Sequence, residues 1–391
     1  MRAVLGGSSM VIGQFCDTFP PSIDGVGRVT QSYCETLMDM GHEAYYIAPQ
    51  PTEMQAQYRF PVILSASMRV PGELFRMGLP ALDLKFRKEL RSIPFDIVHA
   101  QSPFLAGAEA LEIAKKRDIP LVSTFHSKYY DDALAKTHSK VIASGVVQKL
   151  VKFYDRCDGV WTVNNSTAEV LHSYGFRGPI LVMENGTNVE ALKPEADAEL
   201  MKRVKIRKGV PVLLFVGQHN YKKNLHGILG ACALLKNEGR PFQLITAGDG
   251  PDFDDIVKEA ERLGLKDSVQ FLGFVSQRDQ LMALYSHSDL LVFPSLYDNA
   301  PMVLREAAVM GTPGLVVDGS CSAEGITNDY NGFISPNETP EAIRKTIEHA
   351  LPLAKDVGEH ARLTIPVSWE TIMEKVVAEY DRLIDGHSVR L

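Results

Sequence analysis

Two carboxylates with seven residues between them stand in the stretch SLYDNAPMVLREAAVMGTPG, residues 295–314. Asp298 lies shortly before Pro301, a residue suited to the first turn of a helix, and Glu306 follows about one and a half turns along that helix. Two acids around a helix start are typical of ordinary dipole compensation. Such a helix start also directs its amides at anionic oxygens, and Glu306 would face a bound nucleotide if its face of the helix lines a cleft.

Two further segments carry residues suited to phosphate. Gly25 and Gly27 in DTFPPSIDGVGRVTQ follow the first apolar run and stand just before a predicted helix, where bare amides favour a phosphate and a tight turn is an equal explanation. The third position of a dinucleotide fingerprint is Thr30, which disfavours hydride transfer. In FVGQHNYKKNL, Lys222 or Lys223 is placed to neutralise a diphosphate, although surface lysines are usually only solvated.

A single histidine completes the set of candidate residues. His126 follows the apolar run IPLVSTF directly, at the end of a predicted parallel strand, where the residues of an active site are expected. A structural histidine is the commoner role of a lone His, but the polar SKYYDD that follows favours a site. The glycines of AGDGP, residues 247–251, are interpreted as a plain turn.

Composition excludes some classes of protein. The 391 residues are 45% hydrophobic and 23% charged, and the net charge of −7 gives no electrostatic case for binding nucleic acid. Five scattered cysteines, without a CxxC pair or a histidine cluster, indicate a reducing cytosol and no metal site. Because we find no run of 18 apolar residues and no secretion signal, a cytoplasmic protein is expected.

The elements that must position these residues alternate between apolar runs and helical patterns. We predict a doubly wound α/β domain over 10–190, in which Ser166 and Glu169 form a capping box, after an N-terminal extension over 1–9. A polar linker over 191–209 precedes a second parallel-sheet domain over 210–367. A helix over 368–391, with Ser368 as its N-cap, is expected to pack back on the first domain. The fold class is therefore α/β, with two Rossmann-like domains facing a central cleft.

The order of short motifs resembles the retaining glycosyltransferases of the family-4 type, with the GT-B fold, from residue 10 onward. The motifs are DGVGR, TFH at 124–126, NGTN at 185–188, VGQHNYKKN, AGDGP, FLGFV, the Asp298–Glu306 pair, GTP at 311–313, EGI at 324–326 and NGF at 331–333. Each motif alone is weak, whereas their order is specific.

The resemblance implies a nucleotide-sugar donor, a UDP- or GDP-sugar, held mainly by the second domain, with no divalent metal and no other cofactor. It assigns Glu306 to the ribose, Asp298 to the sugar hydroxyls, Lys223 to the departing diphosphate, and His126 to the neighbourhood of the anomeric centre. Donor contacts are expected from a further set of residues: Gly25, Gly27, Gln218, Lys222, Val275, Asn299, Ala300, Met302, Val303, Leu304 and Glu324.

Two departures from the family pattern bear on the donor. The family usually has Glu at position 298, and Asp is one methylene shorter, which weakens inference about the sugar. Gln218 stands where the family commonly has Arg, so leaving-group stabilisation would rest on Lys223, Lys222 or the helix dipole.

The expected reaction moves a hexose, with UDP-glucose as the preferred donor, to an acceptor hydroxyl and gives an α-glycoside. A glycolipid or a cell-envelope saccharide is the expected acceptor, because TFHSKYYDD resembles bacterial glucosyl-diacylglycerol synthases. Lys149, Lys152 and Arg156 lie at helical spacing, as in a face that contacts the inner side of a membrane peripherally. The solvated face of a packed helix explains the same pattern and is favoured at this net charge. A sugar-nucleotide epimerase and a non-catalytic nucleotide-sugar-binding protein remain alternatives.

Overall fold

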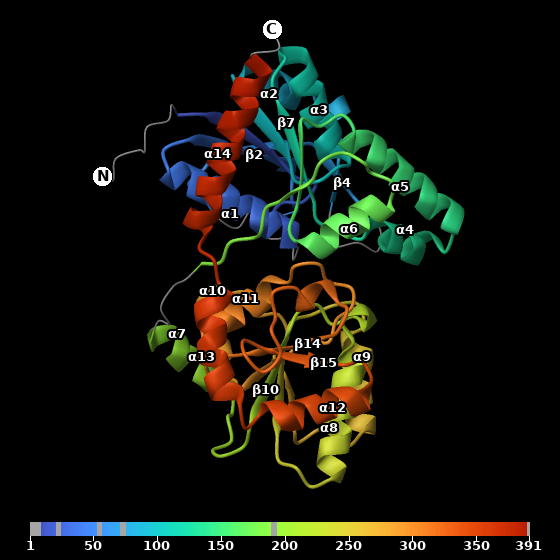
Figure 1. The fold of residues 1–391 in the computed structure, drawn as a ribbon, viewed down its shortest axis with the longest axis vertical. Helices are drawn as coiled ribbons and strands as arrows, with labels where there is room; N and C mark the ends of the chain where they lie inside the picture. The colour runs from blue at the N-terminus through green and yellow to red at the C-terminus, as the bar shows by residue number, and fades with distance from the viewer. Residues whose placement is uncertain (1–8, 21–24, 53–56, 71–75, 189–193, 389–391) are drawn as a thin grey trace. The chain divides into compact units, whose positions relative to one another are not determined.

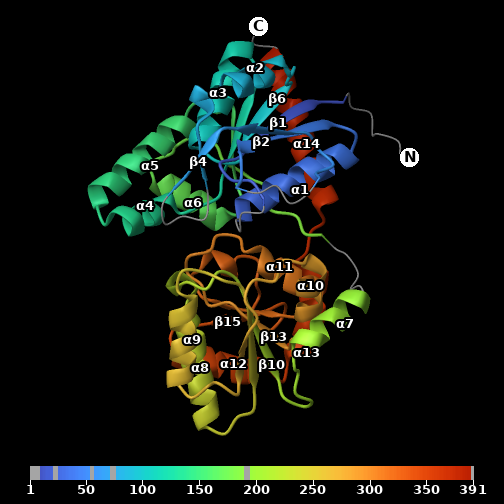
Figure 2. The ribbon, with the colours of Figure 1, turned by 180° about the vertical axis from the view of Figure 1, so that it is seen from behind.

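A computed structural model describes residues 9–20, 25–52, 57–70, 76–188 and 194–388 of the chain. It consists of two compact units. The first comprises Met1–Gly186 with Trp369–Leu391, and the second comprises Thr187–Ser368. Each unit is built around its own parallel sheet (Figures 1 and 2).

The first unit has a seven-stranded sheet in the order β3-β2-β1-β6-β7-β8-β9, in which all neighbours are parallel. The strands are β1 (Val11–Phe15), β2 (Glu43–Pro49), β3 (Val62–Ser65), β6 (Ile97–Ala100), β7 (Leu121–Phe125), β8 (Gly159–Thr162) and β9 (Leu181–Val182). A separate antiparallel pair joins β4 (Ser67–Arg69) to β5 (Arg76–Gly78). Strands β6 and β7 are buried along their whole length, as expected of strands covered on both faces.

Helices cover both faces of this sheet. They are α1 (Gly25–Asp39), α2 (Leu84–Ser92), α3 (Leu105–Arg117), α4 (Tyr129–Thr137), α5 (Lys140–Tyr154), α6 (Asn165–Ser173) and α14 (Trp369–Ser388), with a short 3-10 turn at Pro80–Leu82. Helices α1 and α14 lie side by side in both views and are in contact (Figures 1 and 2). Side chains of α2, α3 and α5 join one apolar core with Phe15, Val98 and Phe125 of the sheet.

The second unit has a six-stranded parallel sheet in the order β12-β11-β10-β13-β14-β15. Its strands are β10 (Val212–Val216), β11 (Gln243–Ala247), β12 (Val269–Phe271), β13 (Leu290–Val292), β14 (Gly314–Val317) and β15 (Phe333–Ser335). This is the strand order of a dinucleotide-type doubly wound fold, and the order reverses between β10 and β13. Ligands in such folds bind outside the carboxyl ends of the strands at that reversal.

The helices of the second unit alternate with its strands. They are α7 (Pro194–Arg203), α8 (Leu225–Asn237), α9 (Phe253–Arg262), α10 (Arg278–Ser286), α11 (Met302–Val309), α12 (Pro340–Ala350) and α13 (Ala354–Thr364), with 3-10 turns at Tyr221–Lys223 and Cys321–Ala323. Helices α8 and α12 pack against each other (Figure 1). A single apolar core joins the sheet to α7, α8, α10, α11 and α12.

Several local features differ from the sequence-based expectations. The capping box is wrong, because Asn164 rather than Ser166 caps α6 and accepts from the Thr167 amide at 2.8 Å. The segment 191–209, predicted as a linker, contains α7, whose Leu200 is fully buried in the core of the second unit. Residues 1–8 of the predicted extension and residues 389–391 of the predicted terminal helix lie outside the described residues.

Candidate functional site

Loops from neighbouring strands bring the second unit's candidate residues to one edge of its sheet. The loop after β10 carries Gln218 to Lys223, and the loop after β13 carries Asp298 to Pro301. These two strands are hydrogen-bonded neighbours and flank the point where the strand order reverses. The candidate residues from these two loops therefore lie where a doubly wound sheet binds its ligand.

Lys223 and Asp298 form an ion pair between the Lys223 ammonium and Oδ1 of Asp298. Their side chains are 14% and 17% exposed, so the pair is largely removed from water. Oδ2 of Asp298 is buried and has no hydrogen-bond partner among the described residues. A half-satisfied carboxylate beside a shielded cation is a polar arrangement that a ligand with hydroxyl donors and an anionic group would complete.

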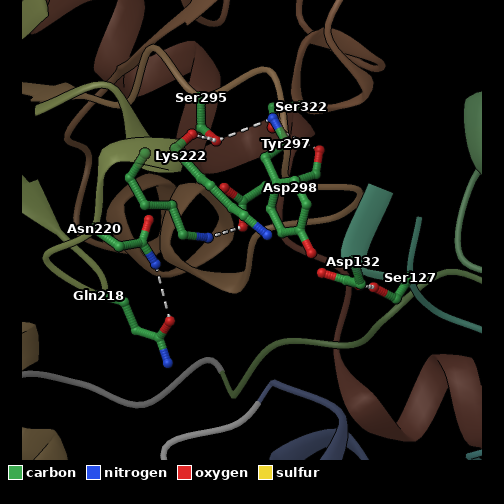
Figure 3. A network of polar contacts seen from close by, with 10 residues as sticks. Ser127, Asp132, Gln218, Asn220, Lys222, Ser295, Tyr297, Asp298 and Ser322 are labelled. Carbon is green, nitrogen blue, oxygen red and sulfur yellow. Dashed lines mark hydrogen bonds and ion pairs between the residues drawn. The ribbon is translucent and has the colours of Figure 1, made fainter. Parts of the chain in front are cut away.

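Aromatic rings and hydroxyl groups support the two loops. The Lys222 ammonium lies 4.4 Å from the centre of the Tyr297 ring, in a cation–π contact. Ser295 donates to the Lys222 carbonyl at 3.5 Å, and Ser322 donates to the Asp298 carbonyl at 3.4 Å (Figure 3). The loops after β10, β13 and β14 are thus joined by direct contacts.

The Gln218 side chain accepts a hydrogen bond from the Asn220 amide at 3.2 Å (Figure 3). Its loop packs against the AGDGP segment, where Gly248 has φ +144° and a Cβ would lie 1.9 Å from the Gly217 carbonyl oxygen. Gly250 is also close to His219, whose carbonyl oxygen a Cβ would approach to 2.5 Å. Glycine is therefore required here for two loops to touch, which gives the turn interpretation of AGDGP a physical cause.

Glu306 is 3% exposed, and both of its carboxylate oxygens are held by residues of α10. Arg278 donates to Oε1 at 2.8 Å, and the Tyr285 hydroxyl donates to Oε2 at 3.0 Å. The Arg278 side chain is 36% exposed and so extends from this buried carboxylate towards the surface. The face of α11 that carries Glu306 is packed on α10, which the periodicity of one helix does not reveal.

Helix α11 starts one residue later than expected. Pro301 has extended backbone angles and precedes the helix, whose first residues are Met302 and Val303. Asn299 is buried, Ala300 is half-buried, and Leu304 is buried with its amide bonded to the Pro301 carbonyl at 3.3 Å. The loop that carries Asp298 therefore leads straight into a helix N-terminus.

The remaining donor candidates of the second unit follow two other strands. Val275 is 7% exposed and comes after β12, and Glu324 is exposed and comes after β14. No hydrogen bond described for either residue fixes a role in binding. The parallel sheet places both at the same edge as Lys223 and Asp298.

In the first unit, His126 directly follows β7 and is half-buried. Its Nε2 lies 2.9 Å from Oε1 of Gln101, which follows the neighbouring strand β6. Ser127 donates to Asp132 of α4 at 3.0 Å, also seen in Figure 3. His126 thus contacts the polar side chain of Gln101 at the carboxyl edge of its own sheet.

The two glycines of the first unit lie inside α1, not before it as predicted, because the helix begins at Gly25. Gly27 is buried, and its carbonyl accepts a hydrogen bond from the Tyr46 hydroxyl at 3.2 Å. A Cβ on Gly25 would meet no atom within 4 Å. The first turn of α1 follows β1 at the same edge of the sheet as His126.

Sequence reasoning missed Arg278, Tyr285 and Gln101, which directly contact predicted site residues. Gln101 follows the run FDIVHA, so its place after a strand was a usable signal. Arg278 and Tyr285 stand on a helix before β13, where the sequence pattern gives no reason to expect a site.

Searches for metal and membrane features cover only the described part of the chain. There, no three His, Cys, Asp or Glu residues are grouped as a metal site would need. None of the helices in those ranges combines the length and apolar composition needed to span a bilayer.

Comparison with known sequences gives two adjoining matches. The profile of the family Glycosyl transferases group 1 matches residues 196–363, and that of Glycosyltransferase Family 4 matches residues 23–191. An α-monoglucosyldiacylglycerol synthase of Streptococcus pneumoniae is 25% identical over 78% of this chain and 70% of its own. A GDP-mannose-dependent α-mannosyltransferase of Mycobacterium tuberculosis is 23% identical over 93% of this chain and 94% of its own.

Solved structures agree in fold. Sucrose-phosphate synthase from Thermosynechococcus elongatus superposes with a TM-score of 0.82 at 18% identity, covering 96% of this chain and all of its own. HepE from Anabaena, crystallised with UDP and glucose, gives 0.75 at 19% identity, covering 95% and 99%. Both cover nearly the whole chain, and the predicted GT-B fold is confirmed.

Proposed function

The chain belongs to the group 1, family-4-type glycosyltransferases, and from that premise we propose that it moves a hexose from a nucleotide sugar to an acceptor hydroxyl with retention of configuration. The transfer needs no divalent metal, because side chains and a helix N-terminus carry the positive charge that the departing diphosphate requires. The product is an α-glycoside.

The observation that carries this proposal is the placement of Lys223 and Asp298 at the reversal of strand order in the second unit. A donor that enters there offers a diphosphate to the lysine and sugar hydroxyls to the carboxylate. Donor binding then exchanges the internal ion pair for two intermolecular contacts. Oδ2 of Asp298 is buried without a partner among the described residues, which supports a role in accepting hydrogen bonds from the sugar hydroxyls.

Each residue has a role that its surroundings support. Lys223 stabilises charge on the leaving diphosphate, and the amides at the start of α11 add the positive end of the helix dipole. Each Glu306 oxygen keeps a second acceptor position beside its bond to Arg278 or Tyr285, and through these positions Glu306 accepts from the ribose hydroxyls. Lys222 is the second cation in the loop after β10, and it supplies the positive charge that Gln218, in place of the family's usual Arg, does not bring.

For the donor we propose glucose carried by UDP, and for the acceptor a glycolipid or a cell-envelope saccharide. Two relatives named α-monoglucosyldiacylglycerol synthase, from Streptococcus pneumoniae and Acholeplasma laidlawii, support glucose and a lipid acceptor. The mannosyltransferase relatives make GDP-mannose the donor to compare. Exposed Lys149 and Lys152 on α5, with Arg156 just after it, supply cations for peripheral contact of a cytoplasmic enzyme with a membrane.

The deciding experiment is a donor-by-acceptor screen in the presence of EDTA, with release of nucleoside diphosphate and product mass as readouts. We expect turnover with UDP-glucose that falls by roughly 10²- to 10³-fold in Lys223→Ala, since preorganised charge at the leaving group is lost. Glu306→Ala should lower activity comparably. Lys258→Ala, a 73% exposed lysine of α9, serves as the matched control and should retain activity.

The other outcomes separate the alternatives. Nucleotide-sugar binding without turnover across a broad acceptor panel would indicate a binding protein. Conversion of the nucleotide sugar into an isomer, with no acceptor present, would indicate an epimerase. Activity that is lost in EDTA and restored by Mg²⁺ would contradict the metal-free mechanism. Each of these outcomes contradicts a different part of the proposal: turnover, transfer to an acceptor, or independence from a metal ion.

A further inference from the structure

A line of buried polar side chains runs through the first unit from His126 to the C-terminal helix α14. Its members in order are His126, Gln101, Gln14, Tyr380, His99 and Thr124. All except His126 are at most 2% exposed. Gln14 lies in β1, His99 in β6, Thr124 in β7 and Tyr380 in α14. Gln101 and His126 directly follow β6 and β7, so residues far apart in sequence form one continuous network.

At the end of the network that contains His99, the contacts of the His99 ring determine where the protons lie. Burial lowers the pKa of His99 well below the usual range, so this ring is neutral and carries one proton. Its Nδ1 lies 2.6 Å from the Tyr380 hydroxyl, and its Nε2 lies 2.8 Å from the Thr124 hydroxyl. The Tyr380 oxygen already accepts from Nε2 of Gln14 at 3.0 Å, so its own proton is available to His99.

The near end follows from the amide orientations of Gln14 and Gln101, and Nε2 of Gln101 also lies 3.4 Å from Nδ1 of His99. Gln14 donates to Tyr380 through Nε2, which leaves its Oε1 to accept from Nε2 of Gln101 at 3.0 Å. Gln101 accordingly presents its carbonyl oxygen Oε1 to His126, 2.9 Å away. A carbonyl oxygen can only accept, so in this orientation of the two amides the proton lies on Nε2 of His126. Every hydrogen bond in the line donates in the same direction, an arrangement in which each bond polarises the next.

We propose that Tyr380, with Gln14 and Gln101, is a positioning residue that holds His126 in one ring orientation and in the tautomer protonated at Nε2. The functional part of this proposal rests on the proposed transferase activity and on the family resemblance, which assigns His126 to the neighbourhood of the anomeric centre. A ring held in one tautomer and one orientation is preorganised for the transition state, whereas a freely turning ring is not. The C-terminal helix therefore contributes to the active site without touching substrate.

Packing alone does not explain the Tyr380 hydroxyl. The Tyr380 ring stacks on Trp161 with centroids 5.6 Å apart and meets His99 edge to face at 5.9 Å. Phenylalanine would keep both ring contacts. Tyr380→Phe hence removes the hydrogen bonds and leaves the aromatic packing, which makes it the variant that separates the two roles.

The test compares Tyr380→Phe with Tyr33→Phe in the full chain. Tyr33 is 2% exposed and contacts the same His99 ring edge to face, but its hydroxyl makes no hydrogen bond in the described ranges. We expect Tyr380→Phe to lower kcat by about tenfold while the donor KM changes by less than about twofold. Tyr33→Phe should leave both constants unchanged, since it removes a hydroxyl outside the network.

A double-mutant cycle asks whether the effect passes through His126. In a His126→Ala background, adding Tyr380→Phe should lower kcat no further, because the group that Tyr380 positions is gone. If the losses of kcat in the two single variants multiply in the double variant, the proposal is overturned. If Tyr380→Phe does not fold, Gln14→Met breaks the same network with a side chain of similar volume, and the same cycle applies.

The tautomer of His126 gives a readout that does not depend on turnover. It is followed by ¹⁵N NMR of protein labelled at histidine, and the His126 signal is assigned as the one that is absent from His126→Ala. The wild type should show Nε2 protonated, and Tyr380→Phe should shift the ring towards a mixture of tautomers. An unchanged tautomer would overturn the positioning role even in an active enzyme. Absence of turnover in the wild type would instead reject the proposed function, while the NMR comparison still tests the network.

Discussion

At the scale of single residues, the ion pair of Lys223 and Asp298 sets up a competition for the lysine. Asp298 neutralises Lys223 and also repels an incoming diphosphate, and both effects act through a largely buried site. The same carboxylate is proposed to hold the sugar of the donor. Its charge should thus oppose binding of a free nucleoside diphosphate and favour binding and turnover of the sugar nucleotide.

This competition predicts opposite effects of Asp298→Asn on two ligands. UDP has no sugar to lose, so its affinity should rise by about three- to tenfold when the carboxylate charge is removed. Turnover of UDP-glucose should fall, because an amide accepts sugar hydroxyls less well than a carboxylate. Calorimetric titration with UDP measures the first effect, and Asp298→Glu, which keeps the charge, should bind UDP as the wild type does. Weaker UDP binding by Asp298→Asn would contradict the competition.

A second residue, Asp17, is expected to make the folding stability of the first unit depend on pH. Asp17 follows β1, and its Oδ1 accepts from the Ala106 amide at the start of α3 at 3.0 Å, while Oδ2 is buried without a partner among the described residues. Burial raises the pKa of this carboxyl from 3.8 to about 6, although backbone amides of α3 lower it in part. The folded state therefore binds the proton more tightly than the unfolded state.

Folding stability from Asp17 should accordingly be greatest at low pH and fall as pH rises from about 4 to about 6. The loss relative to Asp17→Asn should amount to roughly 2 to 3 kcal/mol. Urea unfolding of both proteins between about pH 3.5 and pH 7 measures it, since the difference between them isolates this one group. A difference that stays constant over this range would contradict the raised pKa.

At the scale of elements, the start of α6 offers a direct comparison of two candidate caps. Asn164 accepts from the Thr167 amide, whereas Ser166 lies inside the first turn. We expect Asn164→Ala to lower the unfolding free energy by about 1 kcal/mol, because one helix-end amide loses its partner. Ser166→Ala should cost less, and chemical unfolding of the two variants side by side decides the question. A larger loss at Ser166 would restore the capping box.

The elements show why parts of the fold were predictable from sequence. Strands such as β10 and β11 are buried along their whole length, and a continuous apolar run between turn signals identifies such strands. Strands β9 and β15 have two and three residues, too few to show any period. The cap of α6 was misplaced because Asn, Ser and Thr residues stand together there, and composition does not choose among them.

The candidate site divides in the same way. Lys223, Asp298 and His126 follow strands in the structure, a relation that the sequence displays and that makes them candidates. Arg278 reaches Glu306 only because α10 packs on α11, and Tyr380 reaches His99 across 281 residues. Such contacts depend on how helices dock on a sheet, which is a property of the folded chain rather than of any local pattern.

At the scale of the whole molecule, the two units have separate apolar cores. Leu200 to Val357 contribute to the core of the second unit, whereas Phe15 to Phe176 build one in the first. The proposed donor contacts Lys223, Asp298 and Glu306, all of the second unit. Binding to the folded form of one unit stabilises that unit by mass action, by about 2.7 kcal/mol at a ligand concentration of 100 times Kd.

The positions of the tryptophans allow the stabilisation of one unit by a ligand to be measured without an added label. The chain has two tryptophans, Trp161 and Trp369, and both belong to the first unit. Tryptophan fluorescence therefore follows unfolding of the first unit, while far-UV circular dichroism follows helices and strands of both. We predict that saturating UDP moves part of the dichroism transition to higher temperature and leaves the fluorescence transition in place.

The control for this prediction is Lys223→Ala, which should abolish the shift in dichroism because the nucleotide loses its principal cation. Tyr380→Phe breaks hydrogen bonds of the first unit, so it should lower the fluorescence transition and the first unit's part of the dichroism transition, while the shift caused by UDP remains. A fluorescence transition that rises with UDP as much as the dichroism does would show that the nucleotide stabilises both units. The donor site would then have to include residues of the first unit that hold the nucleotide as firmly as Lys223 does.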